Sequence, residues 1–165
     1  MPGHVIGTSI PYGFAGNVSR MSDCVIAPYK YDIAHASDGN IAFGEPVAFD
    51  STNGGVRKLT VSDDSADVII GFAVRRMGQP KADSADGWYY APGETVDVLL
   101  RGSMSIALEN DTGIAARGSV YVDPATQKLY AATGTGRLAI ANAKFGAGAA
   151  DSNKVAEITL LERVI

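Results

Sequence analysis

The side chains best suited to chemistry in this chain are two histidines and one cysteine. His4 and His35 lie far apart, outside any His-x-x-x-His spacing, and Cys24 alone forms neither a zinc ligand set nor an intrachain disulfide. A nucleophile–histidine arrangement would need one of these histidines, in an irregular segment where rigid positioning is hard. Cys24 begins an apolar stretch and is expected to be a small core residue.

Three polar or glycine-rich loops resemble ligand sites only in part. Residues 63–67 and 110–113 carry carboxylates but lack the ligand count and glycine of a calcium loop. Residues 134–136, Gly-Thr-Gly, lack the Lys-Ser/Thr pair of a phosphate-binding loop. We therefore interpret all three as turns and predict no catalytic residue, no metal ligand and no cofactor.

Composition narrows the class of protein further. The chain has 165 residues, 46% of them hydrophobic, which is enough for one folded domain. A net charge of −4 argues against nucleic-acid binding. No apolar run approaches the about 18 residues of a membrane span, and Met1 to His4 does not open a signal peptide. We expect a protein made in a cytoplasm that binds neither nucleic acid nor membrane.

The elements that would position any site are short strands. The 19 glycines and 7 prolines separate short apolar runs, which favours an all-β fold. The sequence predicts strands over residues 46–50, 56–61, 68–76, 95–100, 103–108, 119–123, 127–132, 138–145 and 154–164. Residues 138–144 could instead form a short helix. We predict a small antiparallel β-sandwich or barrel-like domain.

One module appears twice, weakly, within residues 41–108 and 114–165. In each half a short strand ends on aspartate, at Asp50 and Asp123, and the chain returns through a Lys-Leu pair. The identity between the halves is low, so common descent and chance similarity both remain open. A duplicated strand–turn–strand unit suits a protein whose product is a surface rather than a reaction.

The first segment differs from the rest. Residues 1–38 carry scattered glycines, prolines and aromatic residues with little periodicity, so we expect an extended N-terminal arm beside a core domain of residues 39–165. The arm would lie on its own domain or on a neighbouring subunit. Its aromatic residues are candidate contacts, as are two arginines and an aromatic triplet in the long loop 78–93: Tyr12, Phe14, Tyr29, Tyr31, Arg75, Arg76, Trp88, Tyr89 and Tyr90.

With these elements in order, the chain resembles the structural cement proteins (capsid decoration proteins) of tailed bacteriophages over about residues 11–162. The resemblance rests on short packing and turn motifs taken in order: Gly13-Phe14-Ala15-Gly16, Ile41 to Val47, Ile70 to Arg75, Val96 to Ser103, Gly118 to Val122 and Ile140 to Phe145. The loop 78–93 and residues 146–150 do not match this pattern.

The resemblance implies a late, non-enzymatic virion protein. Such a protein would bind the outside of a capsid between major capsid proteins and stabilise the shell as a homo-oligomer, with a trimer favoured and a dimer possible. Two alternatives stay open from the residues. One is another virion or surface β-protein that binds carbohydrate on Trp88 to Tyr90, and the other is a trimeric all-β hydrolase acting on a nucleotide or a sugar.

Overall fold

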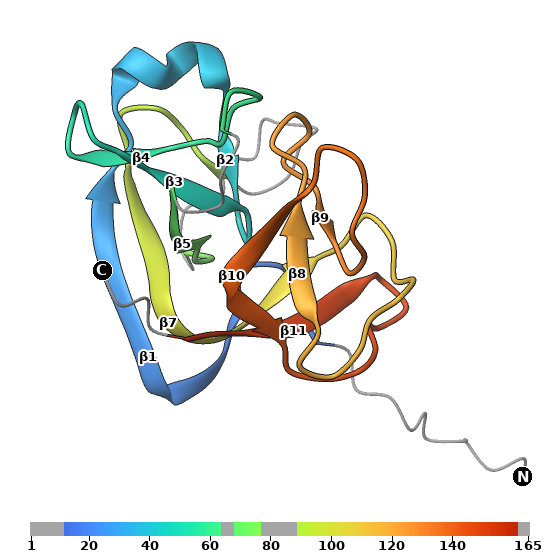
Figure 1. Ribbon diagram of the computed structural model, residues 1–165. Coiled ribbons are helices and arrows are strands. Elements are labelled where there is room, and N and C mark those ends of the chain that lie inside the picture. The colour runs from blue at the N-terminus through green and yellow to red at the C-terminus, as the bar shows by residue number, and fades with distance from the viewer. Residues whose placement is uncertain (1–11, 64–67, 77–88, 162–165) are drawn as a thin grey trace, which may run out of the picture.

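The fold is built almost entirely from antiparallel strands (Figure 1). The computed structural model describes residues 12–63, 68–76 and 89–161. Within these ranges it contains one 3₁₀ helix, η1 (Ile33–Asp38), and the following strands: β1 (Val18–Lys30), β2 (Ile41–Ala42), β3 (Pro46–Asp50), β4 (Gly55–Arg57), β5 (Ile69–Ala73), β6 (Tyr89–Tyr90), β7 (Thr95–Ala107), β8 (Ser119–Val122), β9 (Leu129–Tyr130), β10 (Leu138–Phe145) and β11 (Val155–Leu160).

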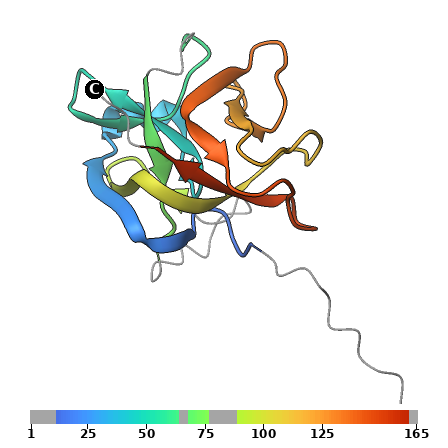
Figure 2. The same ribbon diagram turned by 60° about the horizontal axis from the view of Figure 1, so that its bottom comes forward.

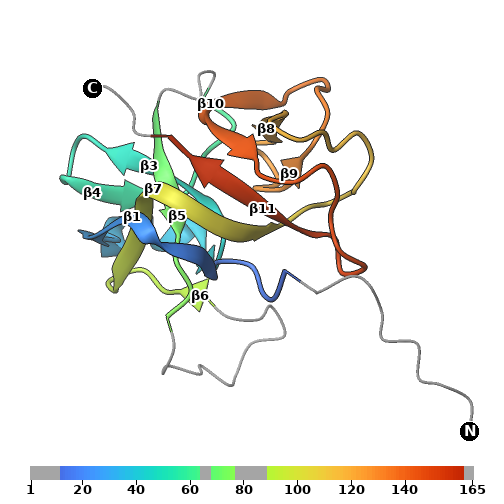
Figure 3. The same cartoon turned by 90° about the horizontal axis from the view of Figure 1, so that it is seen from below.

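One sheet contains nine of these strands. Its order is β4-β3-β5-β7-β11-β10-β8-β9, with β1 also paired to β7, and every pair is antiparallel. The sheet curls into a half-barrel, as Figure 3 shows from below, while β2 and β6 form a small separate pair. The predicted all-β, antiparallel, barrel-like class is confirmed. No helix of the described residues is long and apolar enough to span a membrane.

Strand β7 is the central strand of the molecule. The sequence predicts two strands here, separated at Arg101-Gly102, but the structure has one strand of 13 residues, so that prediction is wrong. Gly102 takes a φ of 120°, and a Cβ there would lie 3.1 Å from the Asp23 carbonyl oxygen and the Cys24 Cα. Glycine at this position lets β7 continue while β1 passes close over it.

The N-terminal segment is part of this sheet. Residues 18–30 form β1, which pairs along β7, and Tyr31 bridges to Val56 at the far end. Figure 2 shows β1, in blue, along the outside of β7, in yellow. Residues 18–30 thus lie on their own domain, one of the two positions open to the expected arm. The division into an arm of residues 1–38 and a core of residues 39–165 stays a prediction.

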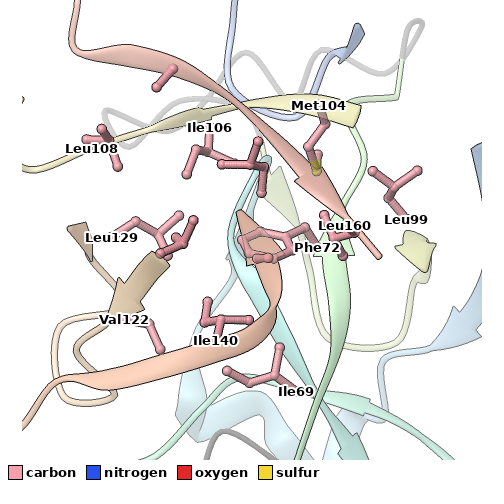
Figure 4. Close-up of a cluster of buried hydrophobic side chains, with 14 of the residues drawn as sticks. Ile69, Phe72, Leu99, Met104, Ile106, Leu108, Val122, Leu129, Ile140 and Leu160 are labelled. Carbon is pink, nitrogen blue, oxygen red and sulfur yellow. The ribbon is translucent and has the colours of Figure 1, made fainter. Parts of the chain in front are cut away.

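The core has two parts. The larger cluster lies between the two halves of the sheet and surrounds Phe72, as Figure 4 shows. The smaller cluster lies within the first half and includes Tyr31, Phe43 and Tyr90. Met104 and Ile106 belong to the larger cluster, and Ser103 and Ser105 are also buried. Both faces of β7 are therefore covered.

Two other predictions need correction. Residues 138–144 belong to β10 and do not form the alternative short helix, because their backbone bonds are made with β8 and β11. The return strand expected over residues 56–61 is shorter, since β4 ends at Arg57. The tertiary pairing, rather than the local sequence, determines these limits.

The two halves follow the same order of pairing. β3 pairs with β4 and β5, and β5 with β7; likewise β8 pairs with β9 and β10, and β10 with β11. The turns before β3 and β8 also match: Gly44 donates to the Ala73 carbonyl, and Arg117 donates to the Phe145 carbonyl, each over 2.8 Å. Whether the halves arose by duplication stays a prediction.

Candidate contact surface

Two of the candidate contact residues belong to the core. The Tyr31 side chain has no exposed surface, and its hydroxyl donates to the backbone carbonyls of Gly39 and His35. Tyr90 is 3% exposed and donates to the Val74 carbonyl over 2.7 Å. Burial is the main cause that raises the pKa of each phenol to about 12. Buried side chains cannot contact a partner directly, so both drop out of the set of surface candidates.

Three other aromatic candidates divide between core and surface. Tyr12 and Tyr29 are half-buried, and Tyr29 packs against the smaller core cluster. Tyr89 is half-buried beside Tyr90, because neighbouring residues of β6 point to opposite faces. Trp88 lies outside the described residues. The aromatic triplet expected from the sequence is therefore not a single exposed surface.

Phe14, Arg75 and Arg76 form an exposed aromatic–basic site. The Phe14 ring is 66% exposed, and the Arg75 guanidinium carbon lies 4.4 Å from its centroid, within the range of a cation–π contact. Arg76 follows Arg75 along the chain and is exposed. Phe14 and Arg75 are the sequence-derived candidates that the structure brings into contact at the surface.

The backbone below Phe14 is held closely. Gly16 donates to the Ser105 carbonyl and accepts from the Arg75 amide, each over 2.8 Å. A Cβ at Gly16, which has a φ of 83°, would lie 2.9 Å from the Arg75 nitrogen and from the Phe43 Cβ. Glycine thus permits the close packing that fixes Phe14 beside Arg75.

A second exposed surface lies on the outer side of β1 and has no counterpart among the sequence-derived candidates. Met21 is 74% exposed, Val25 48% and Ile26 39%, and Leu161, just after β11, is 56% exposed. We call these four residues the β1 patch. Several large apolar side chains exposed on one strand are typical of interaction sites.

A groove of about 570 Å³ separates β1 from the end of β11. It is lined by Arg20, Ser22, Asp23, Arg101, Gly102, Ser103, Thr159, Leu160 and Leu161. Arg101 pairs with Asp23 over 2.9 Å, and the hydroxyls of Ser103 and Thr159 are 3.0 Å apart. The groove is thus polar at its base, and Leu161 is the residue of the β1 patch among those that line it.

Glu157 of β11 fixes the start of β1. Its carboxylate is largely buried and accepts from the Ser19 hydroxyl over 2.6 Å and from the Arg20 guanidinium over 3.3 Å. A buried carboxylate needs such donors. This contact joins the start of β1 to β11, in the second half of the molecule.

The histidine in the described part of the chain has a structural arrangement. His35 Nδ1 lies 2.9 Å from Asp38 Oδ2, and its Nε2 lies 3.0 Å from Asp50 Oδ2. His4 lies outside the described residues. Among the residues described, no group of three or more His, Cys, Asp or Glu side chains is arranged to hold a metal ion.

Asp63 lies in one of the loops interpreted as turns. Its carboxylate accepts hydrogen bonds from both Nη atoms of Arg57, each over 2.8 Å.

Comparisons with known proteins agree on one class. The family model described as structural cement protein (E217 gp24/Pam3 gp6) matches residues 4–161. A chain in the solved structure "The capsid of Myoviridae Phage XM1" has a similar fold, with a TM-score of 0.70, 17% identity and 95% of each chain covered. At that identity the likeness concerns the fold alone. No curated protein sequence matches the chain.

Proposed function

The chain belongs to the structural cement protein family of phages, and from this membership we propose that it binds the outer surface of a phage capsid. It would lie between major capsid proteins and stabilise the shell without catalysing a reaction. It would be made in the host cytoplasm and end on the virion exterior. The homo-oligomer, with a trimer favoured and a dimer possible, is part of the same proposal.

The β1 patch is the observation that carries this proposal. Met21, Val25 and Ile26 expose apolar side chains along one outer strand, and Leu161 exposes another just after β11. Apolar burial contributes about 25 cal/mol per Å² removed from water, so a patch of this kind supplies binding energy without any chemistry. Many copies on one shell add avidity, and each contact can be modest.

The Phe14 site is the second contact in the proposal. Exposed aromatic and arginine side chains are frequent hot spots of protein interfaces. Phe14, Arg75 and Arg76 combine both types on a backbone that is held by β7. Tyr12, Tyr29 and Tyr89 are half-buried and would contribute less contact area than a fully exposed ring.

Carbohydrate binding on the aromatic triplet receives no structural support. A stacking platform needs aromatic faces that are open together, and the Tyr90 ring is 3% exposed and packs edge-on against Phe43 at 5.2 Å. The described residues therefore favour protein contact over sugar stacking.

Co-sedimentation with undecorated phage shells tests the contact surfaces. We expect the wild-type chain to bind shells saturably and the double variant Met21→Ser, Val25→Ser to bind at least about tenfold more weakly, a loss equivalent to about 1.4 kcal/mol. Val61→Ser is the matched control, because Val61 is 79% exposed but lies outside β1. Equal binding by the double variant and the control would contradict the assignment of the β1 patch.

A further inference from the structure

His35 joins η1 to the β3–β4 hairpin. Its Nε2 is 3.0 Å from Asp50 at the end of β3, and its Nδ1 is 2.9 Å from Asp38 at the end of η1. In Figure 1 η1 is the light-blue coil above β3 and β4. The Tyr31 ring is stacked on the imidazole, with centroids 6.4 Å apart and an interplanar angle of 11°. The imidazole is thus enclosed by two carboxylates and one ring face.

The two carboxylate contacts determine the protonation state of the imidazole. A carboxylate oxygen only accepts hydrogen bonds, and a neutral imidazole has a single N–H. Both ring nitrogens of His35 therefore donate at once only when the ring is a cation. A neutral ring would keep one contact and turn its other lone pair toward a carboxylate oxygen.

The residues of η1 itself make few contacts with the rest of the fold, although the buried residues Tyr31 and Ile41 anchor the chain on either side of them. None of the η1 residues is buried, and Ile33 is 71% exposed, so apolar packing does little to hold this segment. Its other contacts are local: Asp32 caps its first turn by accepting from the Ala34 amide, and Tyr31 donates to the carbonyls of His35 and Gly39. Among the described residues, a side-chain hydrogen bond from His35 to Asp50 joins η1 to the hairpin.

Other charged groups lie around this cluster. Asp32 precedes η1 and is paired with Lys30, while Arg57 of β4 interacts electrostatically with both Asp38 and Asp50. Asp50 also accepts from the Thr52 amide over 3.0 Å and from the Asn53 side chain over 2.8 Å. The acidic groups favour a cationic imidazole, and Arg57 partly offsets them.

We propose that His35, Asp38 and Asp50 form a pH-sensitive switch: the imidazolium fixes η1 on the β3–β4 hairpin, and loss of its proton releases η1. The switch does not depend on capsid binding. Its site is separate from the β1 patch and from the Phe14 site, so it would act on the conformation of one end of the molecule.

The direction of the pH effect follows from the contacts. The hydrogen bond to Asp50 is the main cause that raises the pKa of His35, against the opposing effect of burial, and the Asp38 bond adds to it. Because the His35 pKa is raised in the folded state, the protonated imidazole stabilises the closed position of η1. This stabilisation is fully present below the ordinary pKa of 6.5 and is lost as the pH rises through the raised pKa of the folded protein. For each unit by which the contacts raise the His35 pKa, loss of the proton should increase the equilibrium constant for opening of η1 about tenfold.

Nuclear magnetic resonance of the full chain tests the switch directly. We expect the His35 ring carbons to titrate above pH 6.5, and the amide protection of residues 34–39, corrected for intrinsic exchange, to fall with the same midpoint. A His35 pKa at or below 6.5, or η1 protection that does not follow the titration, would overturn the proposal.

Two variants separate the switch from general stability. Asp50→Asn removes the carboxylate charge and should lower the His35 pKa, whereas Asp123→Asn, at a matching turn without a histidine, should leave it unchanged. If Asp50→Asn does not lower this pKa, the Asp50 contact is not what holds the proton. The titration of the wild-type chain answers the question even if Asp50→Asn folds poorly.

Discussion

Asp50, the last residue of β3, and Asp123, the residue that follows β8, make the same set of hydrogen bonds. Each accepts at Oδ1 from the amide two residues ahead, from Thr52 over 3.0 Å and from Ala125 over 2.9 Å. Each accepts at Oδ2 from the side chain three residues ahead, and each backbone carbonyl accepts from the amide four residues ahead over 2.8 Å. Asp50 differs by one added partner, His35.

Replacing either aspartate should destabilise the fold, and Asp50 should matter more. Asp123→Ala removes two hydrogen bonds in a half-buried turn, and we expect a loss of about 1–2 kcal/mol in the free energy of unfolding. Asp50→Ala should cost more because its carboxylate is 5% exposed and its loss leaves His35 with one acceptor fewer. Urea unfolding measures both; a larger loss for Asp123→Ala would contradict this account.

The matching turns before β3 and β8 respond in opposite ways to substitution. Gly44 and Arg117 both have left-handed backbones, with φ of 82° and 61°. Gly44→Ala should cost about 1–3 kcal/mol, because a Cβ there would lie 2.9 Å from the Gly16 nitrogen. Arg117→Gly should stabilise the exposed turn by up to about 1 kcal/mol. Thermal unfolding of the two variants checks the pair, and shifts of the same sign would refute the comparison.

The start of β1 should depend on Glu157. Glu157→Ala leaves the Ser19 hydroxyl and the Arg20 guanidinium without their buried acceptor, and we expect a loss of about 1–2 kcal/mol and faster amide exchange at residues 18–20. Glu109→Ala is the control, since its ion pair with Lys128 is solvent-exposed. Equal effects of the two variants would show that the Glu157 contact does not hold β1.

Strong alkali should unfold the protein partly through two tyrosines. The pKa values of Tyr31 and Tyr90 are raised to about 12, mainly by burial. The unfolded chain loses these protons near the ordinary value of 10.0, so the stability from the neutral phenols is lost as the pH rises from 10.0 to about 12. Tyrosinate absorbance during a pH titration should show two tyrosines that ionise later than the others, and only one such tyrosine in the Tyr31→Phe variant. If all tyrosines ionised together in the folded state, the burial of both rings would be contradicted.

The strands that the sequence predicts well are those with local signals. Residues 46–50 are followed by the turn pair Asn53-Gly54, and β3 has the limits predicted for this strand. Residues 119–123 precede Pro124 in a turn, and β8 ends one residue earlier. In both hairpins the residues that determine where the strand ends lie within a few positions of it.

Strand β1 and the β1 patch could not be predicted in this way. β1 obtains its hydrogen bonds from β7, more than 60 residues later, and its register shifts between Arg20 and Ile26 as it crosses Gly102. These irregularities place Val25 and Ile26 both on the outside, which breaks the alternation by which a strand is recognised. The sequence alone does not show which aromatic rings enter the core. Tyr31 and Tyr90 therefore cannot be distinguished from surface aromatic residues without the structure.

The most direct measurement of the central claim is the disassembly temperature of phage shells with and without saturating amounts of this protein. A protein that binds the assembled shell and not its separated subunits must raise that temperature. We predict an increase that follows occupancy and that is reduced by Met21→Ser, Val25→Ser at the same concentration. Shells that bind the protein to saturation yet disassemble at an unchanged temperature would contradict the stabilising role.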